Sequence, residues 1–234
     1  MKKIAIVGID GCGKSTIAQR CRREGVAVMT CPAYHETPRT PHAELSRALD
    51  ALSRLADRVR SFELKAAAMY LQMTLYGDVE RSFDAPVLVS EHHAIVDSLA
   101  YAPLYVRAVR GPIDRKLEGV IRESVPFDAI LRLSPDLWEL PPQVAALFRG
   151  PDPVAELGRR CKTTLPDVAL MLDVPVGVAL ARLKSRQGSE LHESPDALAA
   201  LRESTRAVVT SLGGHVVDAT KSIDETVAEV LRHV

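Results

Sequence analysis

The chain of 234 residues is poor in aromatic residues and carries no charge imbalance, and each shortage excludes a class of function. Aromatic residues make up 4% of the chain, with one tryptophan, so a platform for stacking RNA or single-stranded DNA is not expected. Lysine plus arginine and aspartate plus glutamate both total 30, so no net charge draws the protein to nucleic acid or to an anionic membrane. We predict no nucleic-acid partner.

Cysteines and long apolar runs are scarce as well. The four cysteines show neither CxxC spacing nor nearby paired histidines, so we expect reduced thiols and no zinc site. No run approaches the roughly 18 apolar residues that cross a bilayer. Residues 1–10 are too short, and too soon interrupted by Asp10, for a signal peptide. These absences predict a cytoplasmic protein without a membrane partner.

Short apolar runs recur along the chain, with helical stretches between them. The runs are residues 4–7, 26–29, 86–90, 170–174 and 215–218. Alternation of strands and helices is typical of a mostly parallel sheet with helices on both faces. The pattern predicts an α/β fold built on a five-stranded sheet.

Two longer segments separate these predicted strands. Between residues 43 and 83, leucines at spacings of three and four predict an amphipathic helix, broken into two. Residues 102–165 are less regular and rich in proline, and we treat them as an insertion within a single domain, 1–234, because they still hold apolar residues to pack. Within the insertion, residues 127–133 are interpreted as a short extra strand.

A phosphate-binding motif follows the first predicted strand. Residues 8–15 fit G-x-x-x-x-G-K-[ST] between a strand and a helix, the context that this motif requires. Its backbone N–H groups and the helix dipole bind phosphate, Lys14 reaches the terminal phosphates, and the Ser15 hydroxyl can ligate Mg²⁺. The predicted cofactors are ATP and Mg²⁺. The predicted ATP contacts here are Gly8, Gly11, Cys12, Gly13, Lys14, Ser15 and Thr16.

A second metal contact is expected from an acid at the end of a neighbouring strand. Glu91 follows the apolar run 86–90 and is the first candidate, so the predicted metal residues are Ser15 and Glu91. The alternative for Glu91 is an acid that caps the next helix. Asp173, which closes the apolar run at 170–172, is a rival for the metal.

Four blocks of sequence resemble the thymidylate kinase family, in the family's order. They are GIDGCGKST at 8–16, DSLAY at 97–101, PDVALMLDVPVGVALAR at 166–182 and VDATKSIDE at 217–225. The resemblance covers about two thirds of the chain and omits chiefly the insertion at 102–165. It implies a P-loop kinase fold and phosphoryl transfer from ATP·Mg²⁺ to a small-molecule acceptor.

The resemblance also assigns residues beyond the phosphate loop. It implies a helical lid at about 182–195, with Thr220 beside the adenine and a homodimer packed through the long helices. Gly11 stands where some members of the family place an arginine. The lid must then supply that positive charge, which points to Arg182 and Arg186 as catalytic cations over the transferring group.

The acceptor site departs from the family's pattern. After the third strand the family has Asp-Arg-Tyr, whose arginine contacts the acceptor's phosphate, and this chain has Glu91-His92-His93. The family's other acceptor arginine aligns with Tyr70 or Gln72. Neither a tyrosine nor a neutral histidine reproduces the paired bonds of a guanidinium to phosphate. We therefore predict an altered acceptor, a nucleoside or another metabolite that bears a hydroxyl.

An acceptor of this kind needs a carboxylate to orient its hydroxyl and accept the proton. Asp10 is our first choice, ahead of Glu36 and Glu91. The residues predicted to bind the acceptor are Asp10, Glu36, Tyr70, His92 and Tyr101.

Two alternatives remain open from the sequence. The first is a genuine nucleoside monophosphate kinase in which Arg39, Arg47 or Arg107 binds the acceptor's phosphate. The second is a P-loop ATPase or switch protein without a small acceptor, against which the lid argues.

Overall fold

The computed structural model describes residues 1–37, 40–184 and 190–234, which form a five-stranded parallel sheet in the order β2-β3-β1-β4-β5. The strands are β1 (Lys2–Val7), β2 (Ala27–Thr30), β3 (Val87–Glu91), β4 (Val168–Asp173) and β5 (His215–Asp218). Each overlaps one of the predicted runs, so the α/β fold is confirmed. Because β1 lies between β3 and β4, its carboxyl end is flanked by both, at the position where open parallel sheets bind ligands.

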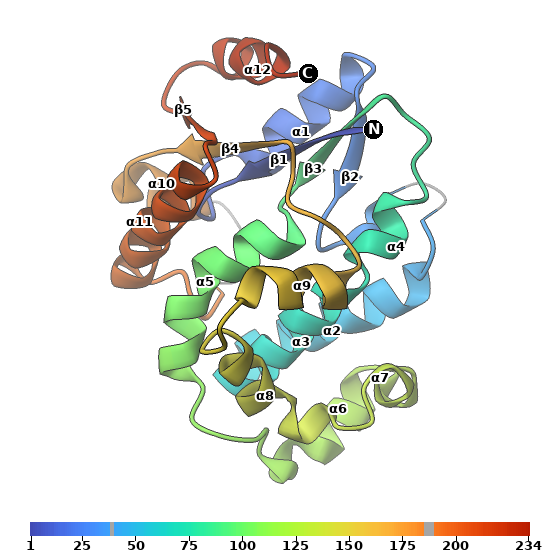
Figure 1. Cartoon of the computed structure of the whole chain (residues 1–234). Helices are drawn as coiled ribbons and strands as arrows, with labels where there is room; N and C mark the ends of the chain where they lie inside the picture. Colours follow the sequence, from blue (N-terminus) through green and yellow to red (C-terminus); the bar gives the residue numbers. More distant parts are fainter. Residues whose placement is uncertain (38–39, 185–189) are drawn as a thin grey trace.

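Helices cover both faces of the sheet (Figure 1). On one face lie α1 (Lys14–Arg23) and α12 (Ile223–Leu231), and on the other lie α5 (Ala94–Ala108) and α11 (Pro195–Ser211). Alternate residues of β1 supply the two cores, since side chains along a strand point to opposite faces. Ile4 and Ile6 pack with Ile17 of α1, whereas Ala5 and Val7 pack with Val96 of α5.

The segment predicted as a broken amphipathic helix forms three helices. They are α2 (Ala43–Val59), α3 (Phe62–Thr74) and α4 (Tyr76–Glu80). The first break falls at Arg60, whose φ of 56° is left-handed. Ser61 then begins α3 by accepting a hydrogen bond from the Leu64 N–H at 3.1 Å, which is a side-chain N-cap.

The insertion is helical in the described residues. It begins within α5, and the part after α5 packs on α2 and α3, on the side of α5 away from the sheet (Figure 1). Its α-helices are α6 (Glu118–Ser124), α7 (Phe127–Leu133), α8 (Leu140–Leu147) and α9 (Pro153–Cys161), with short 3₁₀ turns at Arg115–Leu117 and Leu137–Glu139. The strand expected at 127–133 is wrong, because these residues form α7. Phe127 and Ile130 are both buried, one helical turn apart, and periodicity in so short an apolar run does not distinguish strand from helix.

Two further elements complete the fold. The 3₁₀ turn η1 (Tyr34–Glu36) follows β2, and α10 (Val176–Leu183) follows β4. Within the described ranges, none of the helices combines the length and the apolar character needed to cross a membrane.

Candidate functional site

The phosphate loop joins β1 to α1 and is shaped by glycines in left-handed conformations. Gly8 and Gly11 have φ of 146° and 79°. A Cβ on Gly8 would lie 2.6 Å from the Leu172 carbonyl oxygen, and one on Gly11 would lie 2.5 Å from that of Ala179. Neither position admits a side chain without moving the backbone of β4 or α10. This geometry explains why an arginine cannot occupy position 11 in this chain.

Lys14 is the buried cation of the loop. Its ammonium donates to the carbonyl oxygens of Gly8 at 2.8 Å and Ile9 at 3.1 Å, and lies 3.6 Å from Asp10 Oδ1. Burial would lower the pKa of Lys14, but the surrounding groups, Asp10 among them, outweigh it and raise the pKa. Lys14 is therefore held as a cation inside the loop, as phosphate binding requires.

Ser15 and Glu91 meet at the carboxyl ends of β1 and β3. The Ser15 hydroxyl donates to Glu91 Oε1, and β3 places this carboxylate in register with Ile6 of β1. A hydroxyl and a carboxylate oxygen are the ligand types that Mg²⁺ prefers beside a nucleotide. These two residues fit the predicted metal site.

Asp173 is engaged elsewhere. Its carboxylate accepts two hydrogen bonds from Arg202, at 2.7 and 2.8 Å, and one from Arg206 at 2.6 Å. The hydrogen bond from Arg202 is the main reason why the pKa of Asp173 lies below its usual value. The rival to Glu91 is thus an anchor for α11.

Arg182 lies against the phosphate loop. From α10 its guanidinium donates to the carbonyl oxygens of Gly11 at 3.3 Å, Cys12 at 3.2 Å and Ala219 at 3.1 Å. It therefore joins the loop to the turn that precedes Thr220. Arg186, the other predicted lid cation, lies outside the described residues.

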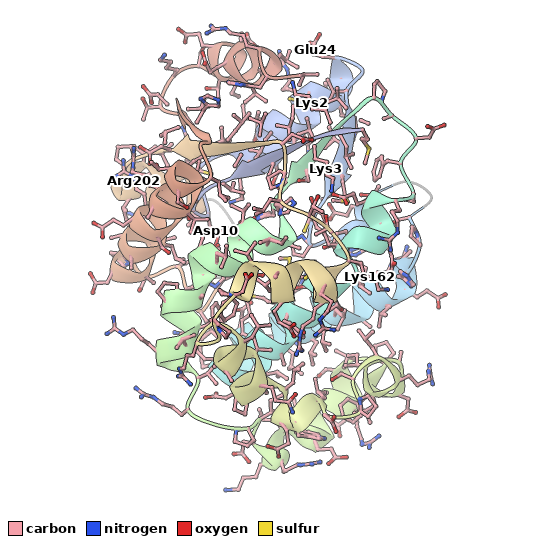
Figure 2. All side chains as sticks on the ribbon, in the orientation of Figure 1. Lys2, Lys3, Asp10, Glu24, Lys162 and Arg202 are labelled. Carbon is pink, nitrogen blue, oxygen red and sulfur yellow. The ribbon has the colours of Figure 1, made fainter. Side chains whose placement is uncertain are left out.

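A large cleft opens beside the phosphate loop, between the sheet and the helices α2 and α3. It has a volume of about 780 Å³, and we call it the central cleft. Figure 2 places Asp10, which lines it, between the strands and α5. Other lining residues used below are Asp57, Arg58, Arg60, Lys65, Gln72, His92, Asp97, Tyr101, Glu190 and His192.

A charged cluster forms one wall of the central cleft. His192 Nε2 lies 2.9 Å from Asp10 Oδ2 and 3.5 Å from Glu190 Oε2. Lys65, only 3% exposed, pairs with Glu190 at 2.9 Å and with Asp57 at 2.7 Å. We call these five residues the Asp10–His192 cluster.

The Asp10–His192 cluster has the spacing of a metal site, but its carboxylates already have cationic partners. Ligand atoms of Asp10, Glu190 and His192 lie within 4.8 Å of one another. Lys14 lies beside Asp10, and Lys65 pairs with both Glu190 and Asp57, so each carboxylate already has a cationic partner. We therefore assign no metal to this cluster.

Asp10 is held as a carboxylate. Burial would raise its pKa, but the hydrogen bond with His192 and the charge of Lys14 outweigh burial, so the pKa lies well below its usual value. Asp10 thus faces the loop lysine and the central cleft at the same time.

The two histidines after β3 have different positions. His92, at φ 70°, lines the central cleft, and its Nδ1 lies 2.9 Å from Asp97 Oδ1. His93 is fully buried, its Nδ1 accepts from the Ile95 N–H at 3.2 Å, and its ring lies 4.8 Å from that of Tyr76. Only His92 is placed to contact a molecule in the cleft.

Burial lowers the pKa of His93 to about 4, so this ring is neutral in the folded protein. An unfolded histidine titrates near 6.5, so below that pH the unfolded state binds more protons and stability falls as pH falls toward 4. We expect His93 alone to remove about 2 kcal/mol of unfolding free energy between pH 7.5 and 5.

His93→Asn tests this expectation, because an asparagine side chain can still accept the Ile95 N–H and cap α5 but does not titrate. Urea unfolding at both pH values should show a smaller loss in the variant than in the parent chain. Equal losses of stability in the variant and the parent would show that His93 is not the group whose protonation destabilises the fold.

Several predicted residues lie away from the central cleft. Glu36 is exposed on η1 and is not among the lining residues, and Thr220 bonds to Asp218 at 2.6 Å. The Tyr70 hydroxyl accepts from Arg160 at 2.8 Å. Tyr70 lines a smaller apolar pocket of about 50 Å³, with which the central cleft shares Tyr101. Thr16 is exposed at the start of α1, beside Ser15.

Sequence reasoning missed Lys65 and His192. They meet at the cleft from segments far apart in the sequence, and no motif marks either. A buried lysine in an otherwise apolar stretch of α3 is the one signal that Lys65 gives, since lysine is seldom buried unless it is paired.

The chain is similar to known proteins in sequence and in fold. No protein-family model matches the chain. A thymidylate kinase from Xanthomonas euvesicatoria pv. vesicatoria (strain 85-10) is 25% identical over 235 aligned positions, which cover 97% of this chain and 80% of that protein.

Solved structures of a deoxyadenosine kinase from M. mycoides share the fold. The structure with dCMP and a flexible dCDP has a TM-score of 0.52 at 15% identity, with 99% of this chain and 97% of that chain covered. The structure with bound dATP has a TM-score of 0.52 at 16% identity, with 99% and 98% covered. In sequence the chain is thus similar to a thymidylate kinase, and it shares the α/β fold of a deoxyadenosine kinase with a phosphate loop after the first strand.

Proposed function

We propose that the chain transfers the terminal phosphoryl group of ATP to a hydroxyl group of a small acceptor bound in the central cleft. The observation that carries the proposal is the position of Asp10. One of its oxygens faces Lys14 of the phosphate loop at 3.6 Å, and the same residue lines the central cleft. The phosphate site and the acceptor site therefore meet at one carboxylate.

Binding of ATP is assigned to the phosphate loop. Its N–H groups and the start of α1 hold the phosphates, and Lys14 neutralises the terminal ones. Ser15 and Glu91 would hold Mg²⁺, which supplies further charge neutralisation when bound. Arg182 lies over Gly11 and Cys12, where its guanidinium can stabilise charge on the transferring group.

Asp10 orients the acceptor. Its carboxylate accepts a hydrogen bond from the acceptor's hydroxyl, whose oxygen bonds to the terminal phosphorus as the bond to the bridging oxygen breaks. The hydroxyl proton passes to Asp10 and then to solvent, and ADP leaves. This transfer depends mainly on position and charge, which the loop and the cleft provide together.

The acceptor that we favour is a nucleoside or another hydroxyl-bearing metabolite without a phosphate. His92 stands in the cleft where the related family has its phosphate-binding arginine. Gln72 is 1% exposed, and its Oε1 has no hydrogen-bond partner among the described residues.

A nucleoside monophosphate is the second candidate, favoured by two cations of the cleft. Arg58 and Arg60 line it, and neither forms an ion pair within the described part of the chain. They replace the arginines considered from the sequence, because Arg39 lies outside the described residues and Arg47 and Arg107 do not line the cleft. The related thymidylate kinase, by its name, supports this candidate.

ATP consumption with and without acceptors tests the proposal. We expect ADP release to be slow from ATP and Mg²⁺ alone and to rise at least about tenfold with a nucleoside, because a kinase excludes water until its acceptor is bound. Steady ATP turnover that no acceptor raises would instead support an ATPase or a switch protein.

The metal assignment has its own test. Glu91→Gln keeps a hydrogen-bond partner for Ser15 but removes the charge. The Mg²⁺ concentration for half-maximal activity should rise about tenfold or more, and turnover should fall. Asp173→Asn is the matched control and should leave the Mg²⁺ dependence unchanged, because Arg202 and Arg206 hold that carboxylate. An unchanged dependence in Glu91→Gln would remove Glu91 from the metal site.

The arrangement of the whole chain follows the same proposal. It is a single P-loop kinase domain in the cytoplasm, with an insertion at about 102–165 and a lid at about 182–195. Residues 185–189 of this predicted lid lie outside the described residues. We also propose a homodimer through the long helices, which sedimentation velocity would detect as twice the chain mass of 25.5 kDa.

A further inference from the structure

His192 is a buried polar side chain at the central cleft that the proposed transfer does not yet use. It is 3% exposed, and Tyr101 of α5 approaches it edge-on, with ring centroids 5.2 Å apart and an interplanar angle of 89°. The ring is therefore fixed in place.

Both ring nitrogens of His192 have a polar partner. Its Nδ1 lies 3.3 Å from the Tyr105 hydroxyl, which is also within hydrogen-bond distance of the Met69 sulfur, at 3.1 Å. A hydroxyl that donates to Met69 can accept from Nδ1. Nε2 lies 2.9 Å from an Asp10 oxygen, and a carboxylate only accepts. Nε2 therefore carries a hydrogen, and a second carboxylate, Glu190, lies 3.5 Å from it, so two anions face a ring whose Nδ1 has a hydroxyl oxygen beside it.

The groups that face the ring are consistent with a cation. Two carboxylates face it, that of Asp10 in the phosphate loop and that of Glu190, two residues before His192. Tyr101 and Tyr105 approach the ring from α5. Lys65 of α3 pairs with Glu190. Burial and Lys65 lower the pKa of His192, but the hydrogen bond with Asp10 and the two carboxylate charges outweigh them and raise it.

We propose that His192, as an imidazolium, is the positioning residue that holds Asp10 toward the acceptor's hydroxyl. The inference rests on the proposed function of Asp10. One Asp10 oxygen is bound by His192 and the other faces Lys14, so the carboxylate is held from two sides and keeps lone pairs for the acceptor. The bond also ties the segment of residues 190–192 to the phosphate loop.

The positioning effect depends on pH in one direction. His192 is charged below its raised pKa, and its ion pair with Asp10 is lost as pH rises through that pKa, which lies above 6.5. We expect kcat/KM for the acceptor to fall on the alkaline side. In His192→Gln, which offers a neutral donor, kcat/KM for the acceptor should be about tenfold lower. This alkaline fall should be absent in the variant, and KM for ATP should be unchanged.

The direct test is a pH titration of the histidine ring nitrogens of the full chain by NMR, which needs no acceptor. The His192 signals are those missing in His192→Gln, and His215→Gln, at an exposed position of β5, is the control. We expect two protonated nitrogens at pH 7 and a lower pKa in Asp10→Asn. A neutral His192 at pH 7, signals that shift when a chelator removes bound metal, or an unchanged pH profile in His192→Gln would overturn the inference.

The titration separates this inference from the proposed function. Suppose that His192 is an imidazolium whose pKa falls in Asp10→Asn, but that the chain phosphorylates no acceptor. That result would confirm the ion pair between the two residues and refute both the phosphoryl transfer and the positioning role that depends on it. A neutral ring in an active kinase would refute the inference alone.

Discussion

Lys14→Ala is expected to lower the rate of phosphoryl transfer by about 10³-fold while the chain remains folded. Lys14 is the buried cation of the phosphate loop, and loss of one fixed charge that neutralises a transferring group has effects of this size. The ammonium also bonds to the carbonyl oxygens of Gly8 and Ile9, so the loop loses two internal contacts in the variant.

Steady-state kinetics with saturating ATP, together with circular dichroism, measure the effect of Lys14→Ala. Lys116→Ala is the matched control, because this lysine is exposed on a 3₁₀ turn of the insertion. It should retain the parental rate. Near-parental turnover in a folded Lys14→Ala variant would remove the phosphate-loop assignment.

The second large effect is expected for Asp10→Asn. An amide keeps the size of the side chain but neither accepts the hydroxyl proton nor retains the ion pairs with Lys14 and His192. The rate should fall by about 10²-fold or more, the usual loss when a positioned general base is removed. Affinity for ATP should change little, because the N–H groups of the loop and Lys14 remain.

Binding and turnover are measured separately for this variant, by fluorescence titration with a labelled ATP analogue and by initial rates. Asp224→Asn is the control. Asp224 is an exposed acid that pairs with Arg20 on the face of the sheet opposite α5, and this variant should behave as the parent does. A rate for Asp10→Asn within about twofold of the parent would show that another group meets the acceptor.

The parts of the fold that the sequence predicts are those with local signals. Each strand is a short apolar run, and the phosphate loop is a contiguous motif in a fixed context. The strand expected at residues 127–133 is wrong because the apolar residues of this short segment fit both the two-residue period of a strand and the period of a helix. Packing against α2 favours the helix.

The residues of the site likewise divide into those with a local sequence signal and those without one. Asp10 and Lys14 belong to one motif, and Glu91 was found because parallel strands end at the same edge of a sheet. His192 meets Asp10 across 182 positions of sequence, and Lys65 meets Glu190 across 125. Only the folded chain brings these residues together, because their contacts depend on how the segment of residues 190–192 lies against α2 and α3.

The central claim is that the acceptor carries no phosphate, and mass spectrometry of the reaction products tests it most directly. The chain is incubated with ATP and Mg²⁺ and with nucleosides, nucleoside monophosphates or a metabolite extract, and Lys14→Ala serves as the blank. We predict a gain of one phosphoryl group on an acceptor that had no phosphate, absent in the blank. A gain confined to thymidylate or another monophosphate would contradict our account of the acceptor site, and would indicate that Arg58 and Arg60 bind the acceptor's phosphate.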